Sequence, residues 1–179
     1  MIKKFIQSLE KCLSYCKFGI YLYVKPYQKI IKNEIKLAAI KDSDIVYQIG
    51  CGAIPFTAIW IARLTGAKVI CIDTDKDAVK RARRVVKKLK LEPLITVQVF
   101  DGSHPINEDY SVCLIALQAA PLDEIVEAIN FNQARVVVAR LPKKSYAKHY
   151  DVLPDTVKIG DKVDQSMKAF DQSVIIFKR

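Results

Sequence analysis

Two patterns of apolar and polar positions alternate along this chain from residue 44 onward. Short runs rich in Val and Ile are separated by segments whose apolar positions recur every three or four residues. The first pattern is typical of strands buried on both faces of a sheet, and the second of helices that cover such a sheet. The predicted strands span 44–49, 68–73, 94–100, 111–117, 135–139 and 173–177, and the predicted helices span 56–64, 75–89 and 122–129. This alternation predicts an α/β fold with a doubly wound, mostly parallel sheet.

The two ends of the chain depart from this alternation. The first forty residues form an amphipathic helical pattern that Pro26 should interrupt, because proline lacks the amide that a helix needs. A second helix is predicted from about 27 to 39. The last strand follows a polar loop instead of a helix, so it could join the sheet as an antiparallel partner. We therefore expect an N-terminal helical extension (1–40) packed on a Rossmann-like domain (41–179).

Composition limits the class of protein. With 179 residues and 51% hydrophobic side chains, the chain can form one domain with a real core, which excludes a disordered protein. The five cysteines are an odd number and contain no C-x-x-C pair, which argues against a disulfide framework and a zinc cluster. No early apolar run is long enough for a signal peptide or a membrane span. We expect a cytoplasmic protein without a metal site.

The net charge of +10, from 29 Lys and Arg against 19 Asp and Glu, leaves nucleic acid, anionic membranes and acidic small molecules open as partners. Its densest part is an acid-free basic run at 80–90, whose apolar positions should pack on the sheet and leave the cations in solvent. An RNA or phosphate contact is the sharper interpretation, but the run has no aromatic side chains for base stacking. The basic, aromatic segment 1–24 could contact a membrane surface, cover the sheet or form a homodimer contact.

The strongest local motif is Gly50-Cys51-Gly52-Ala53-Ile54-Pro55, between the first predicted strand and its helix. Glycine permits a tight turn there and a close approach of the backbone to a ligand, while the following helix begins with free amide groups. Pro55 stands where a dinucleotide-binding loop has its third glycine. A glycine turn of this kind also simply closes many strand-to-helix corners, so the motif needs support from other residues.

Two aspartates supply that support. Asp73 ends the second predicted strand, where an acid can accept hydrogen bonds from a ribose diol, and Asp101 ends the third. Both should lie at the carboxyl edge of the sheet, where ligands bind in open α/β folds. Asp is also a favoured helix N-cap, and we assign that role to Asp75 instead of Asp73. Asp101-Gly102 is also an ordinary turn signal. Together these residues predict a nucleoside site.

The segment Gln48-Ile49-Gly50-Cys51-Gly52, with Asp73 and Asp101, resembles the class I S-adenosylmethionine-dependent methyltransferases. The resemblance implies that the glycine loop passes the methionine moiety, that Asp73 binds the ribose and that Asp101 contacts adenine. The cofactor-binding residues it implies are Gln48, Gly50, Cys51, Gly52, Asp73, Thr74, Asp101, Gly102 and Gln118. Gln48 replaces the usual acid of the first motif. No Asn/Asp-Pro-Pro-Tyr follows the fourth strand, so methylation of the nucleic-acid type is poorly supported.

A narrower resemblance joins Tyr27-x-x-x-Ile31-x-Asn33-Glu34 to the Gly50-to-Thr57 segment. This combination is similar to the nicotianamine synthase-like family, which transfers an aminocarboxypropyl group from the same cofactor. The resemblance implies that Tyr27 and Glu34 border the reaction site. A carboxylate there could orient an amine nucleophile or accept its proton. The alternative from the residues alone is that Tyr27 packs through its ring and Glu34 pairs with Lys29, Lys36 or another nearby cation.

The sequence thus predicts an S-adenosylmethionine-dependent transferase, in the first place a methyltransferase acting on a small-molecule acceptor. Sulfonium chemistry needs alignment and exclusion of water more than a nucleophilic side chain, which fits the absence of a catalytic triad motif. Two alternatives stay open. One is aminocarboxypropyl transfer, and the other is a non-catalytic module that keeps the fold and binds RNA, a membrane or another protein.

Overall fold

The structure is a computed structural model that describes residues 17–179. The predictions for residues 1–16, including most of the basic N-terminal segment, lie outside the described residues. The helices are α2 (Lys17–Val24), the 3-10 helix η1 (Lys25–Tyr27), α3 (Gln28–Leu37), α4 (Phe56–Thr65), α5 (Lys76–Leu89), α6 (Leu122–Ala128) and the 3-10 helix η2 (Lys144–His149). The strands are β1 (Ile45–Ile49), β2 (Lys68–Asp73), β3 (Ile95–Val99), β4 (Val112–Ile115), β5 (Val136–Pro142), β6 (Val157–Asp164) and β7 (Phe170–Lys178).

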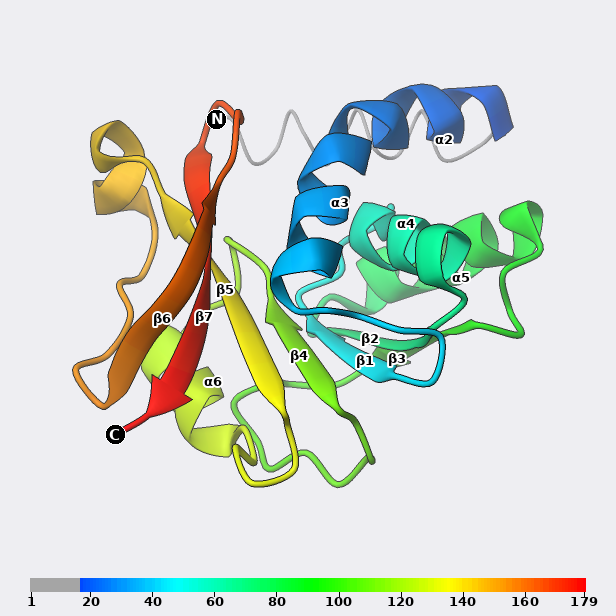
Figure 1. Cartoon of the computed structure of the whole chain (residues 1–179). Helices are drawn as coiled ribbons and strands as arrows, with labels where there is room; N and C mark the ends of the chain where they lie inside the picture. The colour runs from blue at the N-terminus through cyan, green and yellow to red at the C-terminus, as the bar shows by residue number, and fades with distance from the viewer. Residues whose placement is uncertain (1–16) are drawn as a thin grey trace.

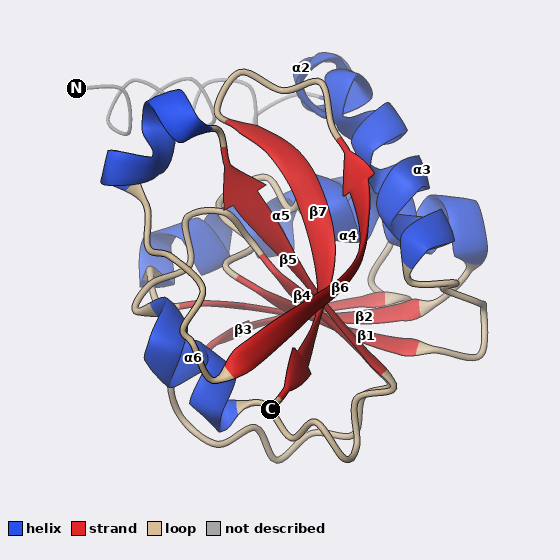
Figure 2. Ribbon diagram, turned by 60° about the vertical axis from the view of Figure 1, so that its left-hand side comes forward, coloured by secondary structure: helices blue, strands red, loops and turns tan. Residues whose placement is uncertain are grey.

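A single sheet organises these elements. Its seven strands lie in the order β3-β2-β1-β4-β5-β7-β6. The first five in this order pair in parallel, and β7 is antiparallel to both of its neighbours, β5 and β6. Figure 2 shows the strong twist of the sheet, with β1, β2 and β3 running across the view while β5, β6 and β7 run up it. The strand order reverses direction at β1, so the carboxyl ends of β1 and β4 flank the switch point where ligands bind in such sheets.

Helices cover both faces of the sheet (Figure 1). On one face, buried Val46, Val69 and Val138 share an apolar core with α2, α3, α4 and α5. On the other face, Ile49 and Ile115 pack in a second core with α6. The sheet is therefore doubly wound, as predicted. From the described part of the N-terminal segment, Ile20, Val24, Ile30 and Ile31 are buried in the first core together with the sheet. The domain boundary at residue 40 stays a prediction.

Helix ends follow local sequence signals. Pro26 lies in η1, which separates α2 from α3 as the proline predicted. The side chain of Asp75 accepts hydrogen bonds from the amides of Asp77 (2.8 Å) and Ala78 (3.1 Å), so Asp75 is the N-cap of α5, as expected. Helix α4 ends at Gly66, whose φ of 81° is the left-handed conformation that glycine adopts readily at this position.

Two elements were missed by the sequence analysis. The segment before the last strand was expected to be a polar loop, but it contains η2 and the edge strand β6. Strand β6 is mostly exposed, and its sequence VKIGDKVD has no apolar run like those of the buried strands. This strand is stabilised by its hydrogen bonds to β7 and not by burial of its own side chains. Within residues 17–179, no helix is long and apolar enough to cross a membrane.

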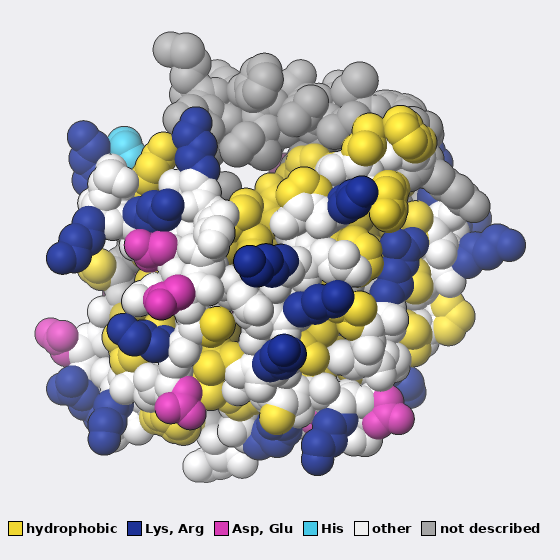
Figure 3. All heavy atoms as spheres, turned by 45° about the horizontal axis from the view of Figure 1, so that its top comes forward, with side chains coloured by type: hydrophobic (Ala, Val, Ile, Leu, Met, Phe, Trp, Pro, Cys, Tyr) yellow, Lys and Arg dark blue, Asp and Glu magenta, His cyan; other side chains and the backbone are white. Residues whose placement is uncertain are grey.

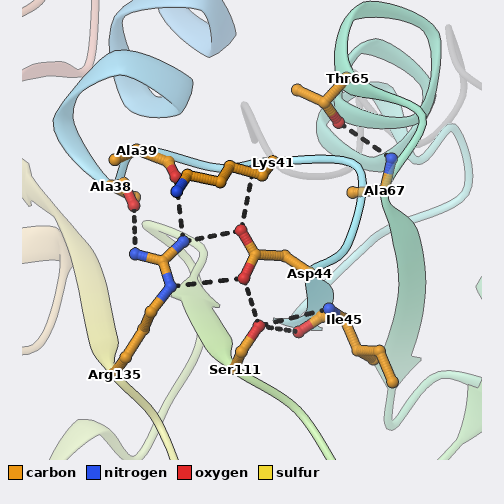
Figure 4. A network of polar contacts seen from close by, with 9 residues as sticks. All are labelled: Ala38, Ala39, Lys41, Asp44, Ile45, Thr65, Ala67, Ser111 and Arg135. Carbon is orange, nitrogen blue, oxygen red and sulfur yellow. Dashed lines mark hydrogen bonds and ion pairs between the residues drawn. The ribbon is translucent and has the colours of Figure 1, made fainter.

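A polar clamp fixes the turn between α3 and β1 (Figure 4). Asp44 is buried, and its carboxylate accepts hydrogen bonds from Arg135 (2.7 Å to Nη2), from the Ser111 hydroxyl (2.6 Å) and from the Lys41 amide (2.7 Å). Arg135 also donates to the carbonyl of Ala38 (2.8 Å) at the end of α3. The clamp therefore ties α3 to the amino ends of β1 and β4, on the opposite edge from the glycine loop.

We expect this clamp to make stability depend on acid pH. Burial alone would raise the pKa of Asp44, but the hydrogen bonds from Arg135, Ser111 and Lys41 outweigh it and lower the pKa from 3.8 to about 2. A depressed carboxyl pKa contributes stability above the unfolded-state value, and this contribution is lost as the pH falls from about 4 towards 2. The loss should be about 2 kcal/mol. Urea unfolding at pH 5.5 and pH 2 would measure it.

Asp44→Asn is expected to remove this contribution, and so to reduce the difference in stability between the two pH values by about the same 2 kcal/mol. The exposed neighbour Asp42 offers a matched control, because Asp42→Asn changes the same charge outside the clamp. Equal pH dependence in the wild type and Asp44→Asn would contradict the assignment.

Candidate functional site

The glycine loop follows β1 at the carboxyl edge of the sheet. The amides of Gly50 and Cys51 both donate to the carbonyl of Ile72 (3.0 Å each), which extends the contact of β1 with β2 by two residues. Gly50 and Gly52 have φ values of 79° and 66°, which a side chain would strain. A Cβ on Gly50 would lie 3.3 Å from the Cβ of Ala116, whereas a Cβ on Gly52 would meet no atom within 4 Å. Gly50 is thus enclosed by the loop after β4, and Gly52 faces open space.

Asp73 holds the glycine loop from the end of β2. Its Oδ2 accepts a hydrogen bond from the Gly52 amide (2.8 Å), and its Oδ1 accepts one from the Asp75 amide (3.0 Å). A carboxylate has about four lone-pair sites, so each oxygen can still accept a further hydrogen bond. Asp73 is half-buried, which leaves it within reach of a ligand at this edge. The arrangement suits a diol bound beside a glycine loop.

Asp101 lies at the neighbouring end of β3 and is exposed. Hydrogen bonds from the amide and hydroxyl of Ser103 lower the pKa of this carboxyl, so it is ionised at neutral pH. The following Gly102 is needed for packing, because a Cβ there would lie 2.7 Å from Cγ2 of Ile49. The glycine thereby lets the turn after β3 lie against the end of β1, which brings Asp101 to the same edge as Asp73.

The other residues predicted to bind the cofactor are placed differently. Thr74 and Gln118 are exposed in the loops after β2 and β4. Gln48 is buried in β1 and accepts a hydrogen bond from the Cys71 thiol (3.7 Å). Cys51 is also buried, and burial raises the pKa of its neighbour Cys71 well above the usual range. Gln48 and Cys51 are therefore buried, and only the thiol of Cys51 contacts the backbone of the loop, at the carbonyl of Gly52 (3.6 Å).

Glu34 of α3 and Arg140 of β5 form a buried ion pair near this edge. Arg140 donates from Nε to Oε1 of Glu34 (2.7 Å) and from Nη2 to Oε2 (2.8 Å), which makes the pair bidentate. Nη2 also donates to the hydroxyl of Thr57 in the first turn of α4 (2.9 Å), and the Ser173 hydroxyl donates to Oε1 (2.7 Å). Glu34 is 1% exposed and Arg140 is 8% exposed. The cation that pairs with Glu34 is thus neither Lys29 nor Lys36.

The Glu34–Arg140 pair belongs to a larger hydrogen-bond network that continues through Ser173 to Gln165. Gln165 donates from Nε2 to the Ser173 hydroxyl (3.2 Å) and to the carbonyl of Ile30 (3.4 Å), and its Oε1 accepts from Asn33 (3.0 Å). Ser173 faces Arg140 because the two are register partners on antiparallel β7 and β5. The network therefore connects α3 with β5, with β7, with α4 and with the turn after β6, and it satisfies both oxygens of Glu34.

Tyr27 reaches the same region through an aromatic stack. Its ring stacks on Phe56 with centroids 4.0 Å apart, and the guanidinium of Arg140 lies 5.5 Å from the Phe56 centroid. The guanidinium also lies 5.6 Å from the centroid of Phe170, the first residue of β7. The structure thus brings Tyr27 and Glu34 into one cluster with Phe56, which directly follows the glycine loop in the chain. Their predicted roles in a reaction stay predictions.

Sequence reasoning missed Arg140 and Ser173, which both donate hydrogen bonds to Glu34, as members of this cluster. One signal was present: Arg140 interrupts the otherwise apolar run Val-Val-Val-Ala-Arg-Leu of β5. A charged residue in a buried strand requires a paired group, so it points to a buried acid somewhere in the fold. Which acid this is depends on the tertiary contact of α3 with the sheet.

Known proteins resemble this chain in sequence. No family model matches the chain. Among curated proteins, the chain is similar to the L-histidine 2-aminobutanoyltransferase of Yersinia pestis, with 32% identity over 120 residues. The matched part is 64% of this chain and 44% of that enzyme, so the chain spans less than half the length of its relative.

Solved structures show the same fold. A variant of MtNAS, a nicotianamine synthase, in complex with S-adenosylmethionine superposes with a TM-score of 0.82 at 20% identity, over 96% of this chain and 70% of that one. An RNA methyltransferase from Salinibacter ruber in complex with S-adenosyl-L-homocysteine gives a TM-score of 0.59 at 20% identity, over 84% and 90% of the two chains. The chain therefore has the Rossmann-like fold of S-adenosylmethionine-dependent transferases, which confirms the predicted fold class.

Proposed function

We propose that the protein binds S-adenosylmethionine at the carboxyl edge of β1, β2 and β3 and transfers a group from it to a small-molecule acceptor. The observation that carries this proposal is the pairing of the Gly52 amide with Asp73, which forms a glycine loop with an ordered acid beside it. Gly52 leaves room for a ligand, because a Cβ on it would meet no protein atom within 4 Å. Asp73 would accept hydrogen bonds from the ribose, and Asp101 would lie beside the adenine.

Of the two transfers predicted from the sequence, we propose aminocarboxypropyl transfer ahead of methyl transfer. The curated relative is named for transfer of a 2-aminobutanoyl group to L-histidine, and MtNAS superposes over more of this chain than the RNA methyltransferase does. This reverses the order that the sequence motifs alone favoured. An amino acid with a free amine, such as L-histidine, is then the first acceptor to test.

S-adenosylmethionine supplies a carbon that its positive sulfur has already activated for displacement. The protein must then orient the acceptor amine and exclude water. Tyr27 and Phe56 provide an apolar wall for this purpose. Both oxygens of Glu34 already accept hydrogen bonds from Arg140 and Ser173, which favours an orienting role over that of a proton acceptor.

Three cysteines support a reducing compartment. Cys51, Cys71 and Cys113 are buried free thiols, as in proteins of the cytoplasm. The exposed lysines of α3 contribute positive charge to the surface shown in Figure 3, but this charge does not identify a partner. Contacts with nucleic acid, a membrane surface or a second copy of the chain stay predictions.

Two measurements test the proposed function. Isothermal titration calorimetry should detect binding of S-adenosylmethionine, and no binding at high micromolar ligand would rule out the enzyme. Mass spectrometry after incubation with L-histidine or an amino-acid pool then separates the two transfers: 5′-methylthioadenosine would indicate aminocarboxypropyl transfer, and S-adenosylhomocysteine would indicate methyl transfer. Cofactor binding without either product would favour the non-catalytic module.

Gly52→Ala is expected to weaken S-adenosylmethionine binding at least tenfold while the protein stays folded. The added Cβ would project into the open space next to the loop, where the ligand is proposed to lie. The left-handed φ of 66° should cost only about 1 kcal/mol of stability. Calorimetry and thermal unfolding measure the two effects separately.

Gly66 provides a matched control for this variant. It has a similar φ of 81°, but it ends α4 and a Cβ there would make an ordinary 3.6 Å contact with Asp42. Gly66→Ala should therefore lose a similar amount of stability and keep its affinity. If both variants bind the ligand as the wild type does, Gly52 does not contact it.

A further inference from the structure

Arg140 uses only part of its hydrogen-bonding capacity within the described residues. Nε and Nη2 donate to Glu34 and Thr57, whereas Nη1 has no partner among residues 17–179. Nη1 is not fully enclosed by the protein, although only 8% of Arg140 is exposed. A guanidinium carries five N–H donors in a rigid plane, so this amino group presents donors in a fixed direction.

The rest of the cluster keeps the guanidinium in place. Glu34 binds its Nε and Nη2 edge, and the rings of Phe56 and Phe170 lie 5.5 and 5.6 Å from its central carbon. The carboxylate and the two ring contacts fix where Nη1 can donate, and such preorganisation favours binding of a matching acceptor group.

The beginning of α4 provides a second feature that favours an anion. Thr57, which accepts from Arg140 Nη2 at 2.9 Å, belongs to the first turn of this ten-residue helix. The N-cap of α4 is Pro55, no side chain caps the helix, and its first turn contains no acidic residue. The amide groups at a helix N-terminus carry a partial positive charge. The accessible side of Arg140 therefore adjoins a helix end that lacks a compensating negative charge.

We propose that Nη1 of Arg140 binds the carboxylate of an α-amino acid group in the transfer site. This inference rests on the proposed function. A carboxylate suits the site because it accepts hydrogen bonds only, which matches the donors of Nη1, and because its negative charge is favoured at the uncapped beginning of α4. Within the proposed reaction this carboxylate has two sources, namely the methionyl moiety of S-adenosylmethionine and an amino-acid acceptor such as L-histidine.

The test combines one variant with ligands that differ in their carboxylate. Arg140→Lys keeps a positive charge for Glu34 but removes the planar group that presents Nη1. Calorimetry compares S-adenosylmethionine with its decarboxylated form, and steady-state kinetics compares L-histidine with histamine. We expect Arg140→Lys to weaken the carboxylate-bearing ligand of one pair at least tenfold and to change its decarboxylated counterpart less than threefold.

The two ligand pairs identify the source of the carboxylate. A selective loss for S-adenosylmethionine assigns the carboxylate to the methionyl moiety, and a selective rise in KM for L-histidine assigns it to the acceptor. If neither pair shows a carboxylate-dependent loss, Arg140 has only a structural role and the inference is wrong. If the wild type binds no S-adenosylmethionine in the same titrations, the proposed function fails, and the inference fails with it.

Thermal unfolding of each variant serves as the control that it is folded. If Arg140→Lys does not fold, the double variant Glu34→Gln/Arg140→Gln replaces the ion pair with two neutral amides and is used in the same comparison. The double variant retains a hydrogen-bonding pair but lacks the positive charge, so the same selective loss is expected. An equal loss for both members of each ligand pair would contradict carboxylate recognition in either variant.

Discussion

Glu34→Ala is expected to lower the free energy of unfolding by about 3–5 kcal/mol, the largest effect of any single substitution considered for this protein. The variant leaves the guanidinium of Arg140 buried without its carboxylate, and the Ser173 hydroxyl without its acceptor. A buried charge that loses its partner costs more than the pair contributed, because water cannot replace the lost hydrogen bonds. Urea unfolding at pH 7, followed by circular dichroism, measures the change.

Two further variants separate the ion pair from general effects of substitution. Glu124→Ala removes an exposed acid from α6 and should change stability by less than about 0.5 kcal/mol. Glu34→Leu combined with Arg140→Met replaces the pair by apolar side chains, which should recover most of the loss. If Glu34→Ala loses less than about 1 kcal/mol, the pair is not buried in solution as it is in this structure.

The same double substitution also bears on function. A protein that regains stability as Glu34→Leu/Arg140→Met but fails to turn over its acceptor would show that the pair is kept for the site and not for the fold. Replacement by apolar groups is often neutral for stability, so retention of a buried pair at a ligand edge has to be explained by what it positions. The accessible Nη1 of Arg140 gives such an explanation.

Much of the fold could be predicted because its signals are local. The strands β1, β2, β4 and β5 are apolar on both faces, and α5 has an apolar stripe with a capping aspartate at its start, so periodicity identified each one. Strand β6 escaped because it is an edge strand with exposed side chains. Its conformation depends on hydrogen bonds to β7, and pairing with a distant strand leaves no period in the sequence.

The residues of the candidate site could also be predicted only where their signals are local. The glycines and the acid that ends β2 lie directly after predicted strands, so their position at the sheet edge follows from the topology. The Glu34–Arg140 pair joins residues 106 positions apart, and neither local spacing nor charge pattern could identify the partner. The sequence offered Lys29 and Lys36 as neighbours of Glu34, but the burial of one face of α3 directs Glu34 away from them and toward the sheet.

Asp73→Ala is expected to weaken S-adenosylmethionine binding about 100-fold. The substitution removes the proposed ribose acceptor, and hydrogen bonds to a charged group contribute about 1.5–3 kcal/mol each. It also frees the Gly52 amide, which donates to Asp73 at 2.8 Å, so the loop loses the contact that orders it. Calorimetry with S-adenosylmethionine and with adenosine measures the effect; both ligands carry the ribose, so both should lose affinity.

Asp75 supplies the control, since it lies two residues away and has the same charge. Its carboxylate caps α5 by accepting from the amides of Asp77 and Ala78, so Asp75→Ala should cost about 1 kcal/mol of stability and change affinity less than threefold. The comparison separates a loss of charge at this edge from a loss of the specific acceptor. A folded Asp73→Ala variant that binds S-adenosylmethionine within threefold of the wild type would exclude Asp73 as the ribose ligand. The acid would then serve only to connect the glycine loop with the start of α5, and the nucleoside would have to be held by backbone groups of the loop and by Asp101.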